Sequence, residues 1–139
     1  MIWDRKFRKV KSPVIHLTLE TLSTVFAVCR LDAAAPIPSW AYTGDFFSVS
    51  KTSDELSIVC PQSNVPHDVK AEKNWRCLKV KGQLDFALTG ILASLATPLA
   101  EAKISIFAIS TFDTDYLMIK QQNFERAITV LTQVGHSVS

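Results

Sequence analysis

The sequence contains few of the residues on which common catalytic and metal-binding motifs depend. Its 139 residues include four glycines, three cysteines and three histidines. We find no GxGxxG, no GxSxG and no GxxxxGK followed by Ser or Thr, so neither a phosphate-binding loop nor a nucleophile elbow is expected. His16, His67 and His136 are scattered and have no acidic partner at a metal-binding spacing. We therefore predict a protein that is not an enzyme and that holds no metal and no cofactor.

The cysteines do not indicate a disulfide framework. Cys29, Cys60 and Cys77 are odd in number, and no two of them have a CxxC spacing. Each lies in an apolar segment, which predicts buried, unreactive packing.

Long hydrophobic runs are also missing. The longest stretch without an ionisable side chain, residues 86–100, includes three hydroxyl residues, a glycine and a proline. A membrane-spanning helix needs about 20 apolar residues, so no membrane partner is expected. The first residues lack the apolar run of a signal peptide, which makes the cytoplasm the expected location.

Positive charge is concentrated at the start of the chain. The net charge is +2, and residues 1–11 hold five basic side chains against Asp4. Ile2, Trp3 and Phe7 alternate with these charges, so this basic leader (residues 1–12) could contact nucleic acid or an anionic surface. A poorly ordered terminal segment is the simpler interpretation. Because the rest of the chain has no basic stripe, nucleic acid is not the expected partner.

The first half of the chain favours extended structure. Residues 14–31 are rich in β-branched side chains, and FFSVS and ELSIVC flank KTSD as a hairpin. Pro38 and Gly44 leave room for one short helix at residues 39–43. Residues 61–74 contain two prolines and little apolar content, which predicts a loop or a single turn.

The second half has clearer periodicity. WRCLKVKGQLDF (residues 75–86) alternates as a strand, and a helix is expected from about Leu88 to Ala102, with Pro98 removing the hydrogen bond to the Ser94 carbonyl. ISIFAIS and YLMIK follow as strands. Asn123 is expected to cap a second helix that ends near Gly135, before a closing strand at residues 136–138.

This order, βαββαβ, is the ferredoxin-like arrangement. The first half repeats it with a stunted first helix and a loop in place of the second. The predicted fold class is α+β, with two ferredoxin-like modules and antiparallel sheets, the first module degenerate. We place the modules at residues 13–74 and 75–139, with their sheets packed or joined edge to edge so that strand edges are hidden.

Two segments of the second module could form a binding site. The segment from Asp85 to Gly90 leads from a strand to a helix N-terminus, where free N–H groups and the helix dipole favour a carboxylate. Ser110, Thr111 and Asp113 end a strand and offer hydroxyls and a carboxylate for an ammonium group. Together they would suit an amino acid, and in a ferredoxin-like sheet they would come near each other only through a neighbouring module or subunit. On the residues alone, the simpler interpretation is that Asp85, Gly90 and Asp113 only shape turns.

The sequence also resembles a known family. GILASLATPLAEAKISIFAISTFDTDYLMIK, FERAITVLTQVGHSV and FAVCRLDAAAPIPSWAYTGDFFSVSKTSDELSIVCP are similar to small bacterial proteins with tandem ACT domains. These proteins in turn resemble the ACT modules of the animal cytosolic arginine sensor. The resemblance covers roughly residues 14–138 and implies an amino acid or similar small effector, bound at a module or subunit interface.

The resemblance places the effector site on one set of residues: Asp85, Phe86, Ala87, Leu88, Thr89, Gly90, Ile91, Ser110, Thr111, Phe112 and Asp113. The equivalent first-half loop, residues 32–40, is longer and proline-rich, so a second site there is in doubt. We expect a homodimer that regulates an unknown protein in trans, with the ligand favouring one arrangement of the modules. Two alternatives stay open: a protein-interaction module with a vestigial pocket, and a small acid/base enzyme using Asp85, Asp113 or Asp115.

Overall fold

Two long strands pass through both halves of the protein. The computed structural model describes residues 2–3, 9–10, 15–82 and 89–139. The long strands are β3 (Thr18–Leu31) and β6 (Ala71–Val80), which pair antiparallel. The other strands are β1 (Ile2–Trp3), β2 (Lys9–Val10), β4 (Ser48–Lys51), β5 (Leu56–Pro61), β7 (Ile106–Ser110), β8 (Asp115–Lys120) and β9 (Ser137–Val138). The helices are η1 (Ser39–Tyr42), η2 (Gln62–Asn64), α1 (Ile91–Glu101), η3 (Gln121–Asn123) and α2 (Phe124–Gln133).

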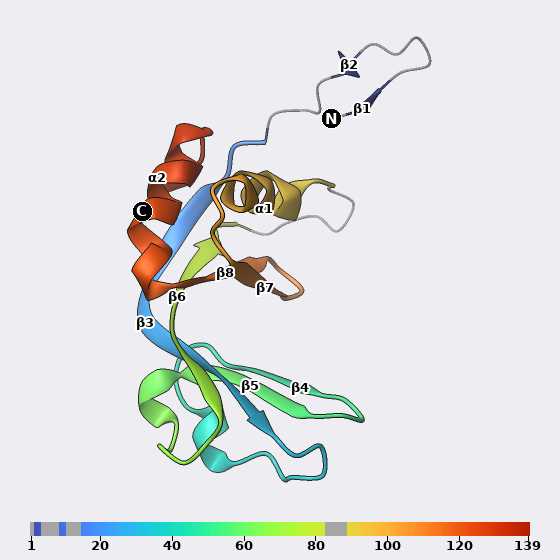
Figure 1. Cartoon of the computed structure of the whole chain (residues 1–139), viewed down its shortest axis with the longest axis vertical. Coiled ribbons are helices and arrows are strands. Elements are labelled where there is room, and N and C mark those ends of the chain that lie inside the picture. The colour runs from blue at the N-terminus through green and yellow to red at the C-terminus, as the bar shows by residue number, and fades with distance from the viewer. Residues whose placement is uncertain (1, 4–8, 11–14, 83–88) are drawn as a thin grey trace.

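The strands β3 to β9 form one seven-stranded sheet. Its order is β4-β5-β3-β6-β8-β7, and β9 pairs with β3 in parallel. Figure 1 shows the sheet strongly bent, with the β4–β5 and β7–β8 hairpins extending from the bend on the same side. Within the leader, β1 and β2 form a separate antiparallel pair. Among the described residues, no helix is long and apolar enough to cross a membrane.

The α+β class with two modules is confirmed, but the strand arrangement corrects two expectations. The closing strand β9 departs from the expected antiparallel sheet, because it pairs in parallel with the start of β3. Thr18 lies opposite Ser137, and Leu19 lies opposite both Val138 and Val80. The segment expected as a loop up to residue 74 already contains the start of β6. Its Asn74 takes a positive φ of 67°, and Gln62 Oε1 accepts a hydrogen bond from its N–H at 2.6 Å. This irregularity interrupts the alternation that the sequence analysis used.

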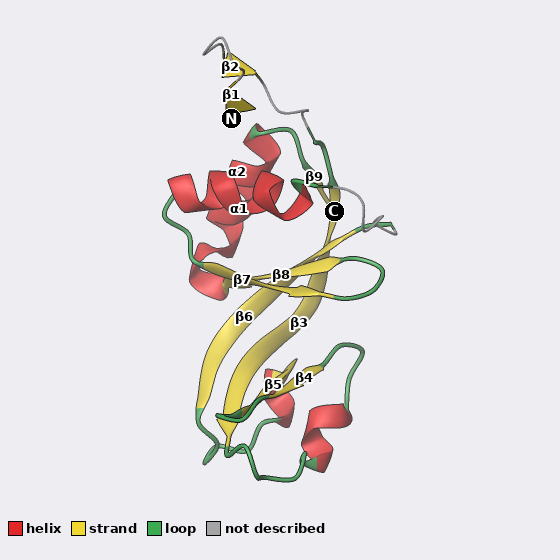
Figure 2. Cartoon of the chain, turned by 90° about the vertical axis from the view of Figure 1, so that its right-hand side faces the viewer, coloured by secondary structure: helices red, strands yellow, loops and turns green. Residues whose placement is uncertain are grey.

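Both long helices cover one face of the second half, as expected (Figure 2). Leu95 and Leu99 of α1 pack with Ala127 and Leu131 of α2 over the sheet. Their sheet partners are Leu19, Leu78, Val80, Leu117 and Ile119. In the first half, the short helix η1 and the segment after η2 cover the corresponding core instead, through Trp40, Ala41, Val65 and Val69.

The ends of the helices depart from expectation in detail. Helix α1 begins at Ile91, after Gly90, and Leu88 lies outside the described residues. The side chain of Asn123 makes no capping bond. The reason is that η3 continues directly into α2, so Asn123 has φ −107° and ψ 0° rather than the extended geometry of an N-cap.

The cysteines are buried, as predicted. Cys29 and Cys60 belong to the first-half core, and Cys77 lies on the opposite face of the sheet from the helices. Burial, together with the neighbouring Cys29, raises the pKa of the Cys60 thiol to about 12, and burial raises the pKa of Cys77 to about 12. Thiols with such pKa values stay protonated at neutral pH and are poor nucleophiles.

A buried histidine compensates for Pro98. Because Pro98 has no N–H, the Ser94 carbonyl lacks its usual helical partner. The N–H of Leu17 donates to His136 Nδ1 at 3.1 Å, so Nε2 carries the proton and donates to the Ser94 carbonyl at 3.0 Å. His136 is 3% exposed. It therefore joins α1, the start of β3 and the C-terminal strand.

We predict that His136→Ala destabilises the protein by about 2–4 kcal/mol, because it opens a cavity and removes the partner of two partly buried backbone groups. The matched control is His67→Ala, an exposed loop position, which should change stability by less than about 0.5 kcal/mol. Urea unfolding followed by circular dichroism measures both. Equal midpoints for the two variants would contradict the role assigned to His136.

Candidate functional site

The predicted site consists of two segments, and the structure describes one of them fully. Four residues of the strand-to-helix segment lie outside the described residues: Asp85, Phe86, Ala87 and Leu88. Thr89 and Gly90 are exposed, and Ile91 is the first residue of α1. Ser110 to Asp113 form the end of β7 and the turn to β8.

Gly90 is the residue at the N-terminal boundary of α1. It has φ 79° and ψ 2°, a left-handed conformation that favours glycine, and as a glycine it has no side chain to cap the helix. Its carbonyl accepts the hydrogen bond from the Ser94 N–H at 2.9 Å. The first N–H groups of α1 have no partner within the helix itself, and this end of the helix carries the positive pole of the helix dipole.

The turn between β7 and β8 is held by its own hydroxyl groups. Ser110 Oγ donates to Asp115 Oδ1 at 2.6 Å, across the last registered pair of the two strands. Thr111 donates to the Thr114 carbonyl through its N–H at 2.8 Å and through Oγ1 at 3.0 Å. The carboxylate of Asp115 therefore has a hydrogen-bond partner within the turn.

An open pocket of about 280 Å³ lies beside this turn. Its lining residues are Lys79, Gly82, Thr111, Asp113, Thr114 and Tyr116. Two of them, Thr111 and Asp113, belong to the predicted set. Ser110 and Phe112 do not line it, and neither do Thr89, Gly90 or Ile91. The pocket therefore combines the strand-end segment with the end of β6 rather than with the start of α1.

The wall of the pocket is fixed by strand pairing and one buried hydrogen bond. Lys79 and Tyr116 are opposite each other in the β6–β8 register, and the Lys79 ammonium lies 5.9 Å from the centre of the Tyr116 ring. Thr114 is buried and donates from Oγ1 to the Val80 carbonyl at 2.8 Å. This bond ties the turn to the end of β6 and keeps the two sides of the pocket together.

Among the described residues, the pocket lining contains one group of each charge. Lys79 supplies an ammonium group and Asp113 a carboxylate, while Thr111 supplies a hydroxyl group. Charge-assisted hydrogen bonds of this kind are stronger than neutral ones, so the lining suits a small zwitterion. The described residues contain no group of three or more His, Cys, Asp or Glu that could hold a metal ion.

Sequence analysis missed four of the lining residues: Lys79, Gly82, Thr114 and Tyr116. The alternation along residues 75–86 did place Lys79 on one face with Cys77, but which residue of the next strand lies opposite depends on register. Register is set by the turn and by the buried face, and this information is distributed over the whole sheet.

Comparison with known proteins supports the relationship that the sequence suggested. A family model described as "ACT domain" matches residues 70–133, and a model of an N-terminal domain matches residues 24–68. The human "Cytosolic arginine sensor for mTORC1 subunit 1" is 35% identical over 94 residues, which are 62% of this chain and 29% of the relative. The rat protein of the same name is 32% identical over 136 residues, 85% of this chain and 41% of the relative. The chain thus spans less than half the length of these relatives.

Solved structures share the fold of this chain. Protein Atu0741 from Agobacterium tumefaciens is 38% identical and superposes with a TM-score of 0.86, covering 90% of this chain and 93% of that one. The regulatory subunit of aspartate kinase from Thermus flavus is 11% identical with a TM-score of 0.57, covering 88% of this chain and 99% of that one, which shows a shared fold alone. This chain therefore belongs to the ACT-domain proteins and is related to the ACT modules of the cytosolic arginine sensor.

Proposed function

We propose that this protein is a non-catalytic regulator that binds an amino acid in the pocket beside the β7–β8 turn and acts on another protein in trans. The observation that carries the proposal is the placement of Lys79, Thr111 and Asp113 around one open pocket. The name of one relative supports it, because that protein is an arginine sensor. The word "cytosolic" in that name supports a cytoplasmic location.

The ligand's two charged groups can be assigned to specific side chains. We assign its ammonium group to Asp113, because an ionised carboxylate accepts several hydrogen bonds. Its carboxylate is assigned to Lys79, which lines the same pocket. The start of α1 at Gly90, the alternative from the sequence analysis, is a second candidate for the carboxylate.

We predict that one amino acid raises the melting temperature of the purified protein. A ligand that binds only the folded state adds about 2.7 kcal/mol at 100 times its dissociation constant, which shifts the midpoint by several degrees. Thermal melting with each of the twenty amino acids at millimolar concentration measures this, with the D-enantiomer of any positive compound as the control. A flat panel would contradict the proposal and favour an interaction module.

We predict that Lys79→Met weakens binding of that amino acid about 10- to 100-fold, the cost of losing one charge-assisted hydrogen bond. Lys81→Met is the matched control, since Lys81 is two residues further along and does not line the pocket. Calorimetric titration measures both affinities. If Lys79→Met binds normally and replacement of Gly90 by Leu abolishes binding in a folded protein, the carboxylate lies at the start of α1 instead.

The edge of the sheet supports a homodimer. Strand β7 is an edge strand whose residues, IFAIS, include no charge, whereas the opposite edge strand β4 ends in Lys51. Uncharged edges pair readily with another strand, and two copies of one edge can pair antiparallel about a two-fold axis. We therefore assign the dimer interface to β7.

We predict that Ile109→Lys on β7 converts the dimer to a monomer, while Val49→Lys on β4 leaves it dimeric. Both positions are half-buried on edge strands. The two variants add the same charge, so a difference between them shows which edge strand forms the interface. Sedimentation velocity measures the mass in each case. A monomeric wild-type protein would contradict the dimer.

One observation favours a second candidate function, the interaction module. Ile37, Tyr42 and Phe47 are large apolar side chains that stay exposed within one segment of the first half. Such a group can form a protein contact. Retained partner binding in a variant that has lost ligand binding would separate the two functions.

A further inference from the structure

An aromatic side chain from the first half contacts the second half beside the pocket. Phe46, two residues before β4, is half-buried. Its ring centre lies 4.4 Å from that of Tyr116 on β8, with the planes tilted by 35°, and 5.7 Å from that of the buried Phe26 on β3, edge to face. Aromatic pairs at these distances stabilise each other beyond the area they bury. Phe46 therefore connects β3 and β8 across the bend of the sheet.

The position of Phe46 is set by the first half. Gly44 has φ 102°, and a Cβ added there would lie 2.7 Å from Cγ of Pro61 at the end of β5. Asn64 Nδ2 donates to the carbonyl of Thr43 at 3.1 Å and to its Oγ1 at 2.6 Å. The segment before Phe46 is thus attached to β5 and η2, and these elements set where the Phe46 ring lies.

The other partner of this contact belongs to the pocket. Tyr116 lines it together with Thr111 and Asp113, and its ring also lies 5.9 Å from the Lys79 ammonium. Phe46 itself is not a lining residue. It packs on a side chain that forms the wall, which is the arrangement of a positioning residue.

We infer that Phe46 is the positioning residue through which the N-terminal half sets the affinity of the pocket, by holding the Tyr116 ring beside Lys79. The inference rests on the proposed amino acid site. Because coupling between binding and structure is reciprocal, a ligand that orders Tyr116 also orders the segment that carries Phe46.

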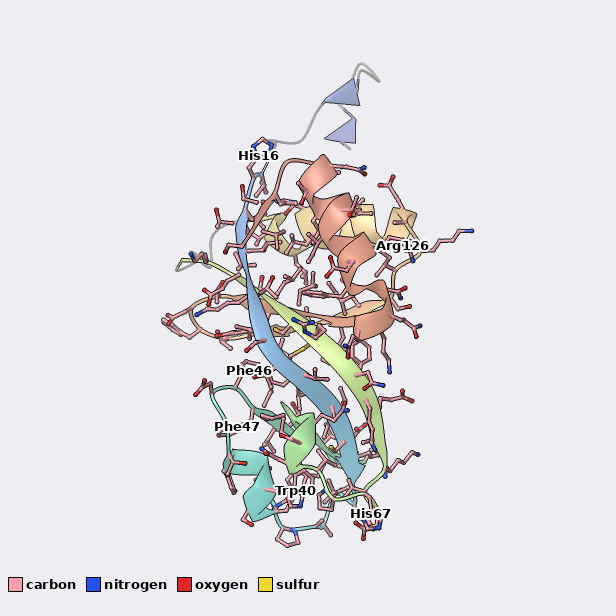
Figure 3. All side chains as sticks on the ribbon, turned by 90° about the vertical axis from the view of Figure 1, so that its left-hand side faces the viewer. His16, Trp40, Phe46, Phe47, His67 and Arg126 are labelled. Carbon is pink, nitrogen blue, oxygen red and sulfur yellow. The ribbon has the colours of Figure 1, made fainter. Side chains whose placement is uncertain are left out.

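The neighbouring residue offers a matched control. Phe47 is 39% exposed, and its ring lies 6.0 Å from that of Tyr42, a residue of the same half. In Figure 3, Phe46 and Phe47 are adjacent on the segment above Trp40. Removing either ring deletes one phenylalanine from the same segment, but only Phe46 contacts the wall of the pocket.

The first experiment needs no ligand. Amide spectra of the ¹⁵N-labelled protein are compared for wild type, Phe46→Ala and Phe47→Ala. We expect Phe46→Ala to shift the signals of Lys79, Thr111 and Thr114, and Phe47→Ala to leave them in place. If both variants shift only first-half signals, or both shift the pocket signals equally, the inference is overturned. Phe46→Leu, which keeps an apolar side chain, replaces Phe46→Ala if that variant does not fold.

The second experiment uses the amino acid that raises the melting temperature. Titration calorimetry should show binding to Phe46→Ala weakened about 3- to 10-fold, the range expected for one aromatic pair. Phe47→Ala should bind like wild type, and Phe46→Tyr, which keeps the ring, should retain most of the affinity. Equal affinity in Phe46→Ala and wild type overturns the inference. If wild type binds no amino acid, the proposed function fails, and the ligand-free spectra still decide whether Phe46 controls the pocket wall.

Discussion

The pairing of β3 with β6 is the constraint on which the rest of the structure depends. Both strands run through the two halves, so the sheet is continuous and no linker separates the modules. Register shifts between Leu22 and Val28 interrupt the pairing, and such irregularities bend strands and increase their twist. The bend allows helices to cover one part of the sheet and short turns to cover the other, while Phe26, Val59, Cys77 and Met118 form a third core on the opposite face.

Local patterns predicted the individual elements well because their information lies within each segment. The short apolar segments IFAIS and YLMIK and the helical spacing of apolar residues around Leu95 were sufficient for β7, β8 and α1. The pairing between distant segments could not be predicted from such local patterns. Nothing in the sequence near residues 136–138 indicates that β9 pairs with β3 in parallel. The positive φ of one residue, Asn74, interrupts the alternation at the start of β6, so the strand was not predicted there.

The same difference between local and long-range information applies to the candidate site. Thr111 and Asp113 were predicted because a strand end is a local feature, whereas Lys79 and Tyr116 join them only through the β6–β8 register. The role inferred for Phe46 was harder to predict from the sequence, because its contact with Tyr116 joins residues from different halves. The other predicted segment begins in residues 83–88, outside the described part of the chain, so its contribution stays a prediction.

The shared strands also limit how a ligand could act. Two modules joined by a flexible linker can rotate as rigid bodies, but here rotation would have to break the pairing of β3 with β6. A ligand shifts an equilibrium only by its different affinity for the two states. In this fold those states could differ in the bend of the sheet, in the packing around Phe46 and Tyr116, or in the proposed contact between two copies at β7. Under the proposed function, a signal from the pocket would pass through packed side chains and strand edges rather than through a hinge, and the aromatic contact between the halves would be part of that route.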